Sequence, residues 1–482
     1  MSTTPSRASD ATPAYPFPGT PAVADAVAPV REAARARTAH PREVREARLR
    51  ALREMLTVHE GRFAAALAAD LHKSRTEAML TEIGPLRAEI DHTLAHLSSW
   101  MKPRRVTVPA AFQPATARVR PVPRGAVLVI GAWNYPLQLA LAPVIGAVAA
   151  GNAVVLSPSE KSPATAAALQ ELVPAALGGE GVVVVEGGAE CVQELLAEPW
   201  DHILYTGGER VGRIVYEAAA KTLTPVTLEL GGKSPTVVTE VKDPAGMARR
   251  IAFGKFINAG QTCVAPDYVL AVGPRAHAQV LRHLPAAIAE FYGADPASSA
   301  DYGRMVSEEH TRRLADMLAE DVAAGAHVVI GGESDVPGRF IEPTVVDGVG
   351  PDSALMREEL FGPILPVLRV ATLQEALDFI AARPHPLASY LFTDHDDDRA
   401  AFAEQVQAGV VSDGVTLVHA GIPSLPFGGV GHSGIGAYHG QTGFETFSQL
   451  RPELTKGTGV DTLRAVYPPH GPVKRAIVPK LM

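Results

Sequence analysis

Hydrophobic positions divide the chain into one helical stretch followed by two regions in which short strands alternate with helices. From about residue 29 to residue 100, apolar positions recur at helical spacing and Gly is scarce. From residue 126 onward, short apolar runs precede longer helical stretches; the runs cover residues 126–130, 154–156, 182–185 and 202–205. Short apolar strands separated by helices predict a parallel sheet with both faces covered.

The same alternation restarts after Gly231-Gly232 and predicts a second unit. Its candidate strands cover residues 236–238, 268–272, 328–330, 364–370 and 389–392. We therefore expect an α/β protein with two parallel-sheet α/β domains. Between the helical stretch and the first sheet, residues 104–120 carry valines and Pro-containing turns, which predict an extended excursion or hairpin arm rather than core.

Three segments bear on targeting and membrane attachment. Residues 139–156 are almost all apolar, but Pro143 and an Ala-Gly-Asn turn signal favour a buried helix followed by a buried strand over a membrane span. Residues 1–20 lack the apolar core of a signal peptide and predict a flexible lead-in. The tail from about residue 451 has no long apolar run. We therefore expect a cytoplasmic protein without a membrane partner.

Composition narrows the class of protein. The chain has 482 residues, of which 46% are apolar and 20% are charged, so we expect a globular protein with a large core and two or three domains. A net charge of −8 argues against a generally nucleic-acid-binding surface, because phosphate contacts need clustered Lys and Arg. The two cysteines, Cys191 and Cys263, argue against a disulfide scaffold or a zinc site built on cysteines, and no metal site is expected.

Cys263 is the first candidate for covalent chemistry. A helical stretch that ends near Asn258 runs into Gly260, which predicts a loop that presents Cys263. A thiol on an accessible loop can act as a nucleophile if its pKa is lowered. An isolated cysteine is more often a small buried hydrophobe, and Cys191, in an apolar helical stretch, is interpreted in that way.

Glu229 and Asn134 are polar residues at the ends of predicted strands. Burial would raise the pKa of Glu229 and make it a general base; a solvent-facing strand residue is the alternative, and the adjoining Gly231-Gly232 favours the functional interpretation. Asn134 follows the strand at 126–130, where ligands bind in open α/β sheets and where an amide could stabilise an oxyanion. Taken alone, Asn134 is better interpreted as a helix N-cap.

A glycine turn indicates a phosphate site more weakly. Gly207, Gly208 and Gly212 follow a predicted strand and open a helix, and a free helix N-terminus suits a phosphate. No G-x-G-x-x-G pattern occurs at the strand-to-helix turns, and a lone Gly-Gly turn is usually only a turn.

Several segments, taken together and in order, resemble the aldehyde dehydrogenase superfamily from about residue 30 onward. The matching segments are Trp133-Asn134-Tyr135-Pro136, Glu229-Leu230-Gly231-Gly232-Lys233, Gly260-Gln261-Thr262-Cys263, Glu358-Glu359-Leu360-Phe361-Gly362-Pro363 and the Gly-rich run 426–440. Taken singly, the fourth segment would predict a surface turn with a core aromatic, and the last a linker. Segments 262–268 and 437–440 and the basic tail resemble the class 3 branch, which is typically dimeric and acts on aromatic, fatty and coniferyl-type aldehydes.

The resemblance implies a mechanism and a cofactor. Cys263 would add to the aldehyde as a thiohemiacetal, with Asn134 and the Cys263 backbone N–H as the oxyanion hole. Hydride transfer to NAD(P) would leave a thioester, and Glu229 would activate the water that hydrolyses it to a carboxylic acid. The implied cofactor-binding residues are Trp133, Ser157, Glu160, Gly207, Gly208, Gly212, Leu230, Glu359 and Phe361.

Two positions depart from the family pattern. Ser157 stands where a Lys usually contacts the adenosine ribose and can accept a 2′-phosphate, so NAD is expected, with NADP possible if Arg210 or Arg213 compensates. Gly208-Glu209 replaces a Ser-Thr type pair, and a carboxylate beside a pyrophosphate is repulsive unless Glu209 points away.

The resemblance also implies how the chain is divided. A Rossmann-like NAD(P)-binding domain with N-terminal helices takes residues 1–103 and 126–231, a catalytic domain 232–411, a bridging or oligomerisation arm 104–125 and 412–450, and a tail 451–482. We expect a homodimer that binds a small-molecule aldehyde.

Two alternative functions stay open. In a CoA-acylating enzyme of the same superfamily, a thiol would replace water in the second half of the reaction, and the retained Glu229 favours hydrolysis. In a non-catalytic family member, the fold would serve binding or structure, and the intact set Cys263, Glu229 and Asn134 argues against that function.

Overall fold

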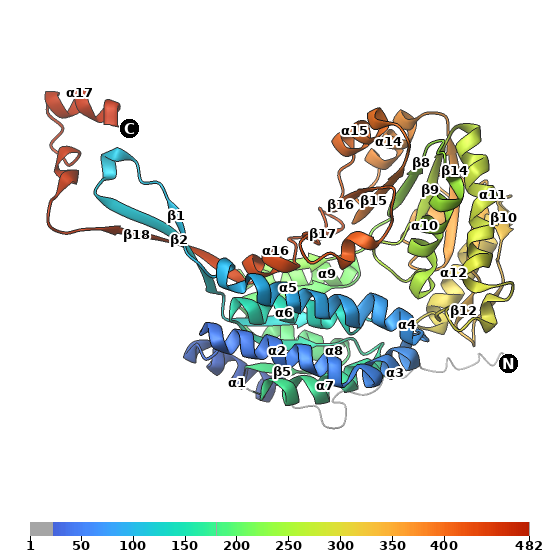
Figure 1. Ribbon diagram of the computed structural model, residues 1–482, viewed down its shortest axis with the longest axis horizontal. Coiled ribbons are helices and arrows are strands. Elements are labelled where there is room, and N and C mark those ends of the chain that lie inside the picture. The colour runs from blue at the N-terminus through green and yellow to red at the C-terminus, as the bar shows by residue number, and fades with distance from the viewer. Residues whose placement is uncertain (1–22, 180, 482) are drawn as a thin grey trace, which may run out of the picture.

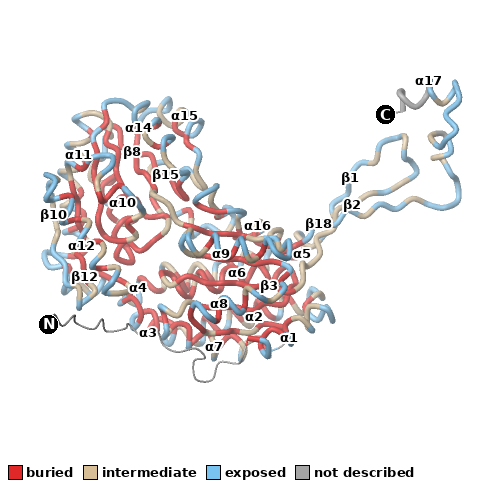
Figure 2. The backbone as a smooth tube through the Cα atoms, turned by 180° about the vertical axis from the view of Figure 1, so that it is seen from behind, coloured by how far each residue is buried: buried red, intermediate tan, exposed pale blue. Residues whose placement is uncertain are grey.

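The computed structural model describes residues 23–179 and 181–481, which form two sheet-based units and a projecting arm (Figure 1). The lead-in expected at residues 1–20 lies outside the described residues. Burial is concentrated in the two units, and the arm is mostly exposed or half-buried (Figure 2). Within the described residues, no helix combines the length and the apolar character needed to cross a membrane.

The first unit is built on a six-stranded sheet in the order β17-β7-β6-β3-β4-β5. Neighbouring strands are parallel except for the antiparallel β17–β7 pair. All four strands predicted in this region are confirmed. Their bounds, with those of the other two, are β3 (Ala126–Ile130), β4 (Ala153–Ser157), β5 (Val182–Val184), β6 (His202–Thr206), β7 (Val226–Glu229) and β17 (Gly434–Ile435).

Alternate residues of β3 enter different cores because side chains alternate across a strand. Val127 and Val129 pack with one group of helices, and Leu128 and Ile130 with another. The first group is α2 (Arg42–Val58), α3 (Glu60–Leu71), α5 (Gly84–Trp100), α6 (Gln138–Ala150) and α7 (Pro163–Leu177). The second is α1 (Val23–Ala36), α8 (Ala189–Ala197) and α9 (Glu209–Ala220). Helix α6 is almost wholly buried, which explains the apolar run at 139–156 without a membrane.

The second unit is built on a seven-stranded sheet in the order β10-β13-β14-β9-β8-β15-β16. Only the β10–β13 pair is antiparallel. The strands are β8 (Pro235–Val238), β9 (Tyr268–Val272), β10 (His327–Ile330), β13 (Thr344–Asp347), β14 (Ile364–Val370), β15 (Ala388–Phe392) and β16 (Val410–Asp413). Its helices are α10 (Pro244–Phe256), α11 (Gly273–Tyr292), α12 (Glu308–Ala323), α13 (Ala354–Arg357), α14 (Leu373–Ala381) and α15 (Asp396–Gln405).

The arm is a three-stranded antiparallel sheet in the order β1-β2-β18, and it leaves the first unit beside α5 and α16 (Figure 1). Its elements are β1 (Arg104–Val106), β2 (Ala115–Pro123), β18 (Ser448–Lys456) and the adjoining helix α16 (Gly440–Thr446). The extended segment predicted at 104–120 is thus confirmed, but its main partner comes from a segment more than 300 residues away, with nine paired positions.

Shorter elements complete the chain. They are α4 (Arg75–Ala78), η1 (Met79–Ile83), η2 (Ala110–Phe112), η3 (Ile257–Gly260), η4 (Pro296–Ser298), β11 (Ser334–Asp335), β12 (Phe340–Ile341), η5 (Val418–Gly421), η6 (Thr462–Ala465) and α17 (Pro472–Leu481). Element η1 is a π-helical turn between α4 and α5, and such turns occur frequently at functional sites.

Candidate active site

The residues singled out in the sequence gather where the two sheets face each other. Gly207 and Glu229 stand at the carboxyl ends of β6 and β7 in the first sheet. Cys263, Glu359 and Leu387 precede the amino ends of β9, β14 and β15 in the second sheet. A cavity of about 240 Å³ is lined by residues of both sets, which we call the inner cavity.

A second cavity, of about 580 Å³, also reaches Cys263, and we call it the outer cavity. Its walls come from η1, the start of α5, the end of α10 and the segments around η5 and 438–439, and most of its side chains are apolar. Leu139, Cys263 and Phe427 line both cavities. The thiol therefore stands at the junction of a mostly apolar chamber and a more polar one.

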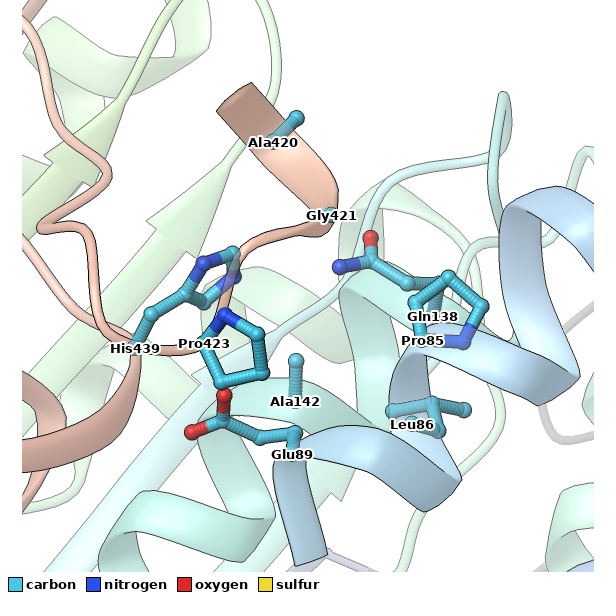
Figure 3. A pocket seen from close by; sticks show the side chains of 9 residues that line it. All are labelled: Pro85, Leu86, Glu89, Gln138, Ala142, Ala420, Gly421, Pro423 and His439. Atoms are coloured by element: carbon cyan, nitrogen blue, oxygen red, sulfur yellow. The ribbon is translucent and has the colours of Figure 1, made fainter. Parts of the chain in front are cut away.

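A small polar pocket adjoins the outer cavity (Figure 3). Its volume is about 10 Å³, which is room for about one water molecule or hydroxyl group. Gln138 and His439 line both this pocket and the outer cavity. Glu89 lines the pocket but not the outer cavity. The buried Nδ1 of His439 has no hydrogen-bond partner among the described residues. This pocket gives the outer cavity a polar corner.

The turn that presents Cys263 depends on an unusual backbone after α10. Asn258, Ala259 and Gly260 all have positive φ, of 53°, 50° and 75°. The expected loop is confirmed, but it begins with two left-handed residues that are not glycine. Gln261 fixes the turn, because its amide donates to the carbonyl of Asn258 and accepts from the N–H of Val306.

Asn134 lies beside this turn and does not cap a helix. Its Nδ2 donates to the Gln261 carbonyl at 3.0 Å. The N-cap interpretation is wrong because a turn separates Asn134 from α6, whose cap position is held by Leu137. An amide nitrogen carries two hydrogens, so one orients the side chain and the other is left to serve an oxyanion.

Burial and two neighbouring carboxyl groups favour the neutral form of the Cys263 thiol. Burial, followed by the negative charges of Glu359 and Glu229, raises its pKa to about 12. The backbone N–H groups of Cys263 and Val264 oppose that rise. The lowered pKa that a nucleophile requires is therefore not a property of this state of the protein.

Glu229 is buried at the end of β7, so the alternative of a solvent-facing strand residue is wrong. Its side chain is 2% exposed, and neither carboxylate oxygen has a partner among the described residues. Burial raises its pKa well above the usual value for a glutamate, as the sequence predicts. Glu229 lines the inner cavity together with Cys263. The cavity therefore holds an unpaired carboxyl group and a thiol.

The far wall of the inner cavity is formed by Glu359, Phe361 and Trp133. The rings of Trp133 and Phe361 meet edge to face, with centroids 5.2 Å apart. Burial raises the pKa of Glu359 to about 8. A Cβ at Gly231 would displace the Glu359 carboxylate from its position. Aromatic faces with one carboxyl group fit a flat ring and a ribose hydroxyl.

The glycine turn at the start of α9 fits a phosphate. Gly208 occupies the cap position without a side-chain cap, and a Cβ there would meet no atom within 4 Å, so the helix N-terminus is open to a ligand. The Glu209 carboxylate is bound by Arg213 and by His432, the latter at 2.9 Å. The repulsion expected from Glu209 is therefore offset by two basic groups.

The remaining cofactor candidates fall into two groups. Leu230 lines the inner cavity, and Gly212 packs closely against it on α9. Ser157 and Glu160 lie at the carboxyl end of β4 and do not line the inner cavity. The Ser157 hydroxyl is buried and has no partner among the described residues. The strand order places them on the far side of β3, where an extended dinucleotide can reach them.

Several residues at the site are given no role by the sequence pattern. His310, on α12, lines the inner cavity and binds the Phe361 carbonyl at 2.8 Å through Nε2. Tyr135 and Thr262 share a hydrogen bond of 2.6 Å next to the thiol. Such contacts join segments far apart in the chain, so no local pattern reveals them. Among the described residues, no group of three His, Cys, Asp or Glu is arranged to hold a metal ion.

Comparisons with known proteins agree on one family. The model of the family described as "Aldehyde dehydrogenase family" matches residues 11–452. The chain is 44% identical to "Aldehyde dehydrogenase family 3 member B1" of Bos taurus, with 93% of this chain and 95% of the relative covered. It is 43% identical to "Aldehyde dehydrogenase, dimeric NADP-preferring" of Mus musculus, with 89% and 94% covered.

A solved structure shows the same architecture. The substrate-bound state of Staphylococcus aureus AldH superposes with a TM-score of 0.92 at 38% sequence identity, with 96% of this chain and 100% of that chain covered. This structural match supports the prediction from the sequence of two α/β units built on parallel sheets.

Proposed function

The chain belongs to the aldehyde dehydrogenase family, and we propose that its nucleophile is Cys263. Its activity is the NAD(P)-dependent oxidation of aldehydes. One observation carries the proposal: Cys263 is shared by a mostly apolar cavity that suits an aldehyde and by a second cavity, lined by aromatic rings and two buried carboxyl groups, that suits a nicotinamide ring. A carbon atom bonded to this sulfur would be accessible from both chambers.

The first half of the proposed mechanism takes place at Cys263. The thiol proton passes to solvent, the sulfur bonds to the carbonyl carbon, and the carbonyl oxygen becomes an oxyanion. The free N–H of the Asn134 amide and the backbone N–H of Cys263 donate to that oxygen. NAD(P), when bound, supplies an acceptor for the hydride that leaves the same carbon. The product on the enzyme is a thioester.

Glu229 carries the second half in this proposal. Its unpaired, buried carboxyl group has a raised pKa, so as a carboxylate it is a strong enough base to take a proton from water near neutral pH. The resulting hydroxide attacks the thioester carbon, the carbon–sulfur bond breaks, and a carboxylic acid leaves. Retention of a base beside the thiol favours hydrolysis over transfer to CoA.

The cofactor site is proposed to extend from Glu359 and Phe361 to the glycine turn and on to Ser157. Trp133, Leu230, Gly207, Gly208, Gly212 and Glu160 complete the proposed set. Ser157 brings no positive charge to a 2′-phosphate, and Arg213 is already bound to Glu209, which supports NAD over NADP. The mouse relative is named NADP-preferring, so NADP is the alternative to be tested.

The substrate is proposed to be an aldehyde with an apolar body. The outer cavity of about 580 Å³ is of the size that takes a small molecule, and its walls are mostly apolar. A homodimer formed through the arm and a cytoplasmic location are also proposed. The mouse relative is named dimeric, which supports the first; the second stays an expectation from the sequence.

A kinetic screen tests the proposed function. Purified protein is mixed with NAD or NADP and a panel of aliphatic and aromatic aldehydes, and the absorbance of the reduced cofactor is followed. We expect turnover, with the carboxylic acid as product whether or not CoA is present. Formation of acyl-CoA would establish the acylating alternative, and no signal with any aldehyde and either cofactor would favour a non-catalytic protein.

A further inference from the structure

We infer that the buried ion pair between Lys73 and Glu82 positions the oxyanion hole. Both side chains are fully buried, and their charged atoms lie 2.5 Å apart. Neither residue lines the inner or the outer cavity, so neither touches a substrate placed there. The inference rests on the proposed function, because it assigns the pair to the donor that stabilises the oxyanion.

Glu82 holds the backbone that follows Asn134. It lies in the π-helical turn η1, and its second carboxylate oxygen accepts from the N–H groups of Leu137 and Gln138, at 2.9 Å and 3.2 Å. These N–H groups stand at the start of α6, where no residue caps the helix with its own side chain. A carboxylate from another helix therefore fixes the end of the turn that contains Asn134.

Lys73 holds the beginning of the same turn. Its Nζ donates to the carbonyl oxygen of Asn134 at 3.1 Å and lies 3.9 Å from the centre of the Tyr135 ring. The pair thus forms hydrogen bonds to both ends of the turn: the ammonium group binds Asn134, and the carboxylate binds Leu137. The peptide that carries the Asn134 side chain cannot rotate without breaking one of these contacts.

Asn258 extends the connection to the cysteine turn. Its Nδ2 donates to the Asn134 carbonyl at 2.8 Å, beside the Lys73 ammonium, and to the Gln261 carbonyl at 3.1 Å. The Asn134 amide donates to that same Gln261 carbonyl. Lys73 is therefore joined through two carbonyl oxygens to the turn that carries the second oxyanion donor, the Cys263 N–H.

The contribution of this buried ion pair to stability does not by itself explain its presence. The free energy needed to remove both charged groups from water offsets much of the Coulomb attraction between them. A pair of apolar residues of similar size often stabilises the folded protein equally well. The pair offers directed hydrogen bonds that an apolar pair lacks. Two donor-bearing turns from distant parts of the chain are thereby set in one geometry, as an oxyanion hole requires.

The test removes both charges together, in Lys73→Met/Glu82→Gln, so that no unpaired charge is left in the core. The acylation rate is measured as the first-turnover burst of reduced cofactor, beside the aldehyde KM, the cofactor Kd and the thermal midpoint. We expect the burst rate to fall about 10-fold to 100-fold with KM and Kd changed less than about threefold. If the double variant does not fold, Glu82→Asp, which keeps the charge but shortens its reach to the N–H groups of Leu137 and Gln138, should show the same pattern.

Asn152→Ala is the matched control. Asn152 is fully buried and joins Gly125, Ala147 and Phe447 at the amino end of β4, away from the thiol. It should lower the thermal midpoint and leave the burst rate near that of the unaltered protein. An unchanged burst in the Lys73 and Glu82 variants, or an equal loss in Asn152→Ala, would overturn the inference. Absence of any reduced cofactor from the unaltered protein, in the first turnover and in the steady state, would instead refute the proposed function.

Discussion

At the scale of single residues, the notable feature is that the thiol of Cys263, the proposed nucleophile, is disfavoured from ionising. Cys263 shares its surroundings with the buried carboxyl groups of Glu229 and Glu359, and both disfavour a thiolate. The thiolate is therefore a minor form of Cys263 at neutral pH.

This suppression predicts the pH dependence of alkylation. A thiol with a pKa of about 12 is neutral between pH 7 and pH 10, and its thiolate fraction rises about tenfold for each pH unit in that range. The alkylation rate of Cys263 by iodoacetamide in the ligand-free protein should rise steadily with pH without a plateau. Cys263→Ala controls for the buried Cys191. A plateau below pH 9 would show that the thiol ionises more easily.

The sequence predicts the identity of the reacting groups better than their orientation. Cys263 and Glu229 stand out from their neighbours, and the raised pKa of Glu229 follows from an acid between leucines on a covered sheet. The role of Asn134 could not be read from its neighbours in the sequence, because Asn is also a favourable helix N-cap. Its hydrogen-bond partner, the carbonyl of Gln261, lies more than 100 residues away in the chain. Lys73, Glu82 and His310 act through partners distant in sequence and leave no local trace.

At the scale of elements, the turn after α10 determines where the sulfur lies. Gly260 has a φ of 75°, and a Cβ there would overlap the carbonyl of Gly362. The turn therefore packs against the segment that follows Glu359 and Phe361. Only a glycine permits both the backbone conformation and the close approach.

Gly260→Ala tests this packing. We expect the turnover number to fall by about 100-fold or more, because a displacement of about 1 Å at a reacting group has that effect. Gly178→Ala is the matched control: Gly178 has a φ of 76° in the left-handed region, and a Cβ there would meet no atom within 4 Å. It carries a left-handed backbone cost of roughly 1–2 kcal/mol without the clash. Equal activity losses in the two variants would mean that strain alone matters.

Element prediction from the sequence succeeds for most strands that are buried on both faces, although the buried strand β13 escapes it. β3, β4, β9 and β15 are such strands, and each appears as a compact apolar run. β16 and β18 escape prediction because their residues are mostly exposed or half-buried and include charged side chains. Their strand conformation depends on partners elsewhere in the chain, β15 and β2.

At the scale of the whole molecule, the arm is the part with the least core of its own. Apolar side chains stand exposed on it, with Val106 at 50%, Leu450 at 37% and Leu454 at 70%. A three-stranded sheet with exposed apolar residues is stabilised by a second surface. The division into a cofactor domain, a catalytic domain, an arm and a tail remains our proposal.

The proposed dimer predicts the effect of a charge on the arm. Leu454→Asp should convert dimer to monomer in light scattering, because a buried unpaired carboxylate opposes association. Leu223→Asp is the control, since Leu223 is 90% exposed at the end of α9 and lies outside the arm. If both variants keep the mass of the unaltered protein, and that mass is a dimer, the arm is not the interface.

The central claim, covalent catalysis by Cys263 at the junction of two cavities, is tested most directly by trapping the thioester. Glu229→Gln removes the proposed base and keeps the size of the side chain. After incubation with NAD and an aldehyde that the unaltered protein oxidises, intact-protein and peptide mass spectrometry should show one acyl group, located on Cys263. An acyl group on Cys191, or full steady-state turnover in Glu229→Gln with no adduct, would contradict the account.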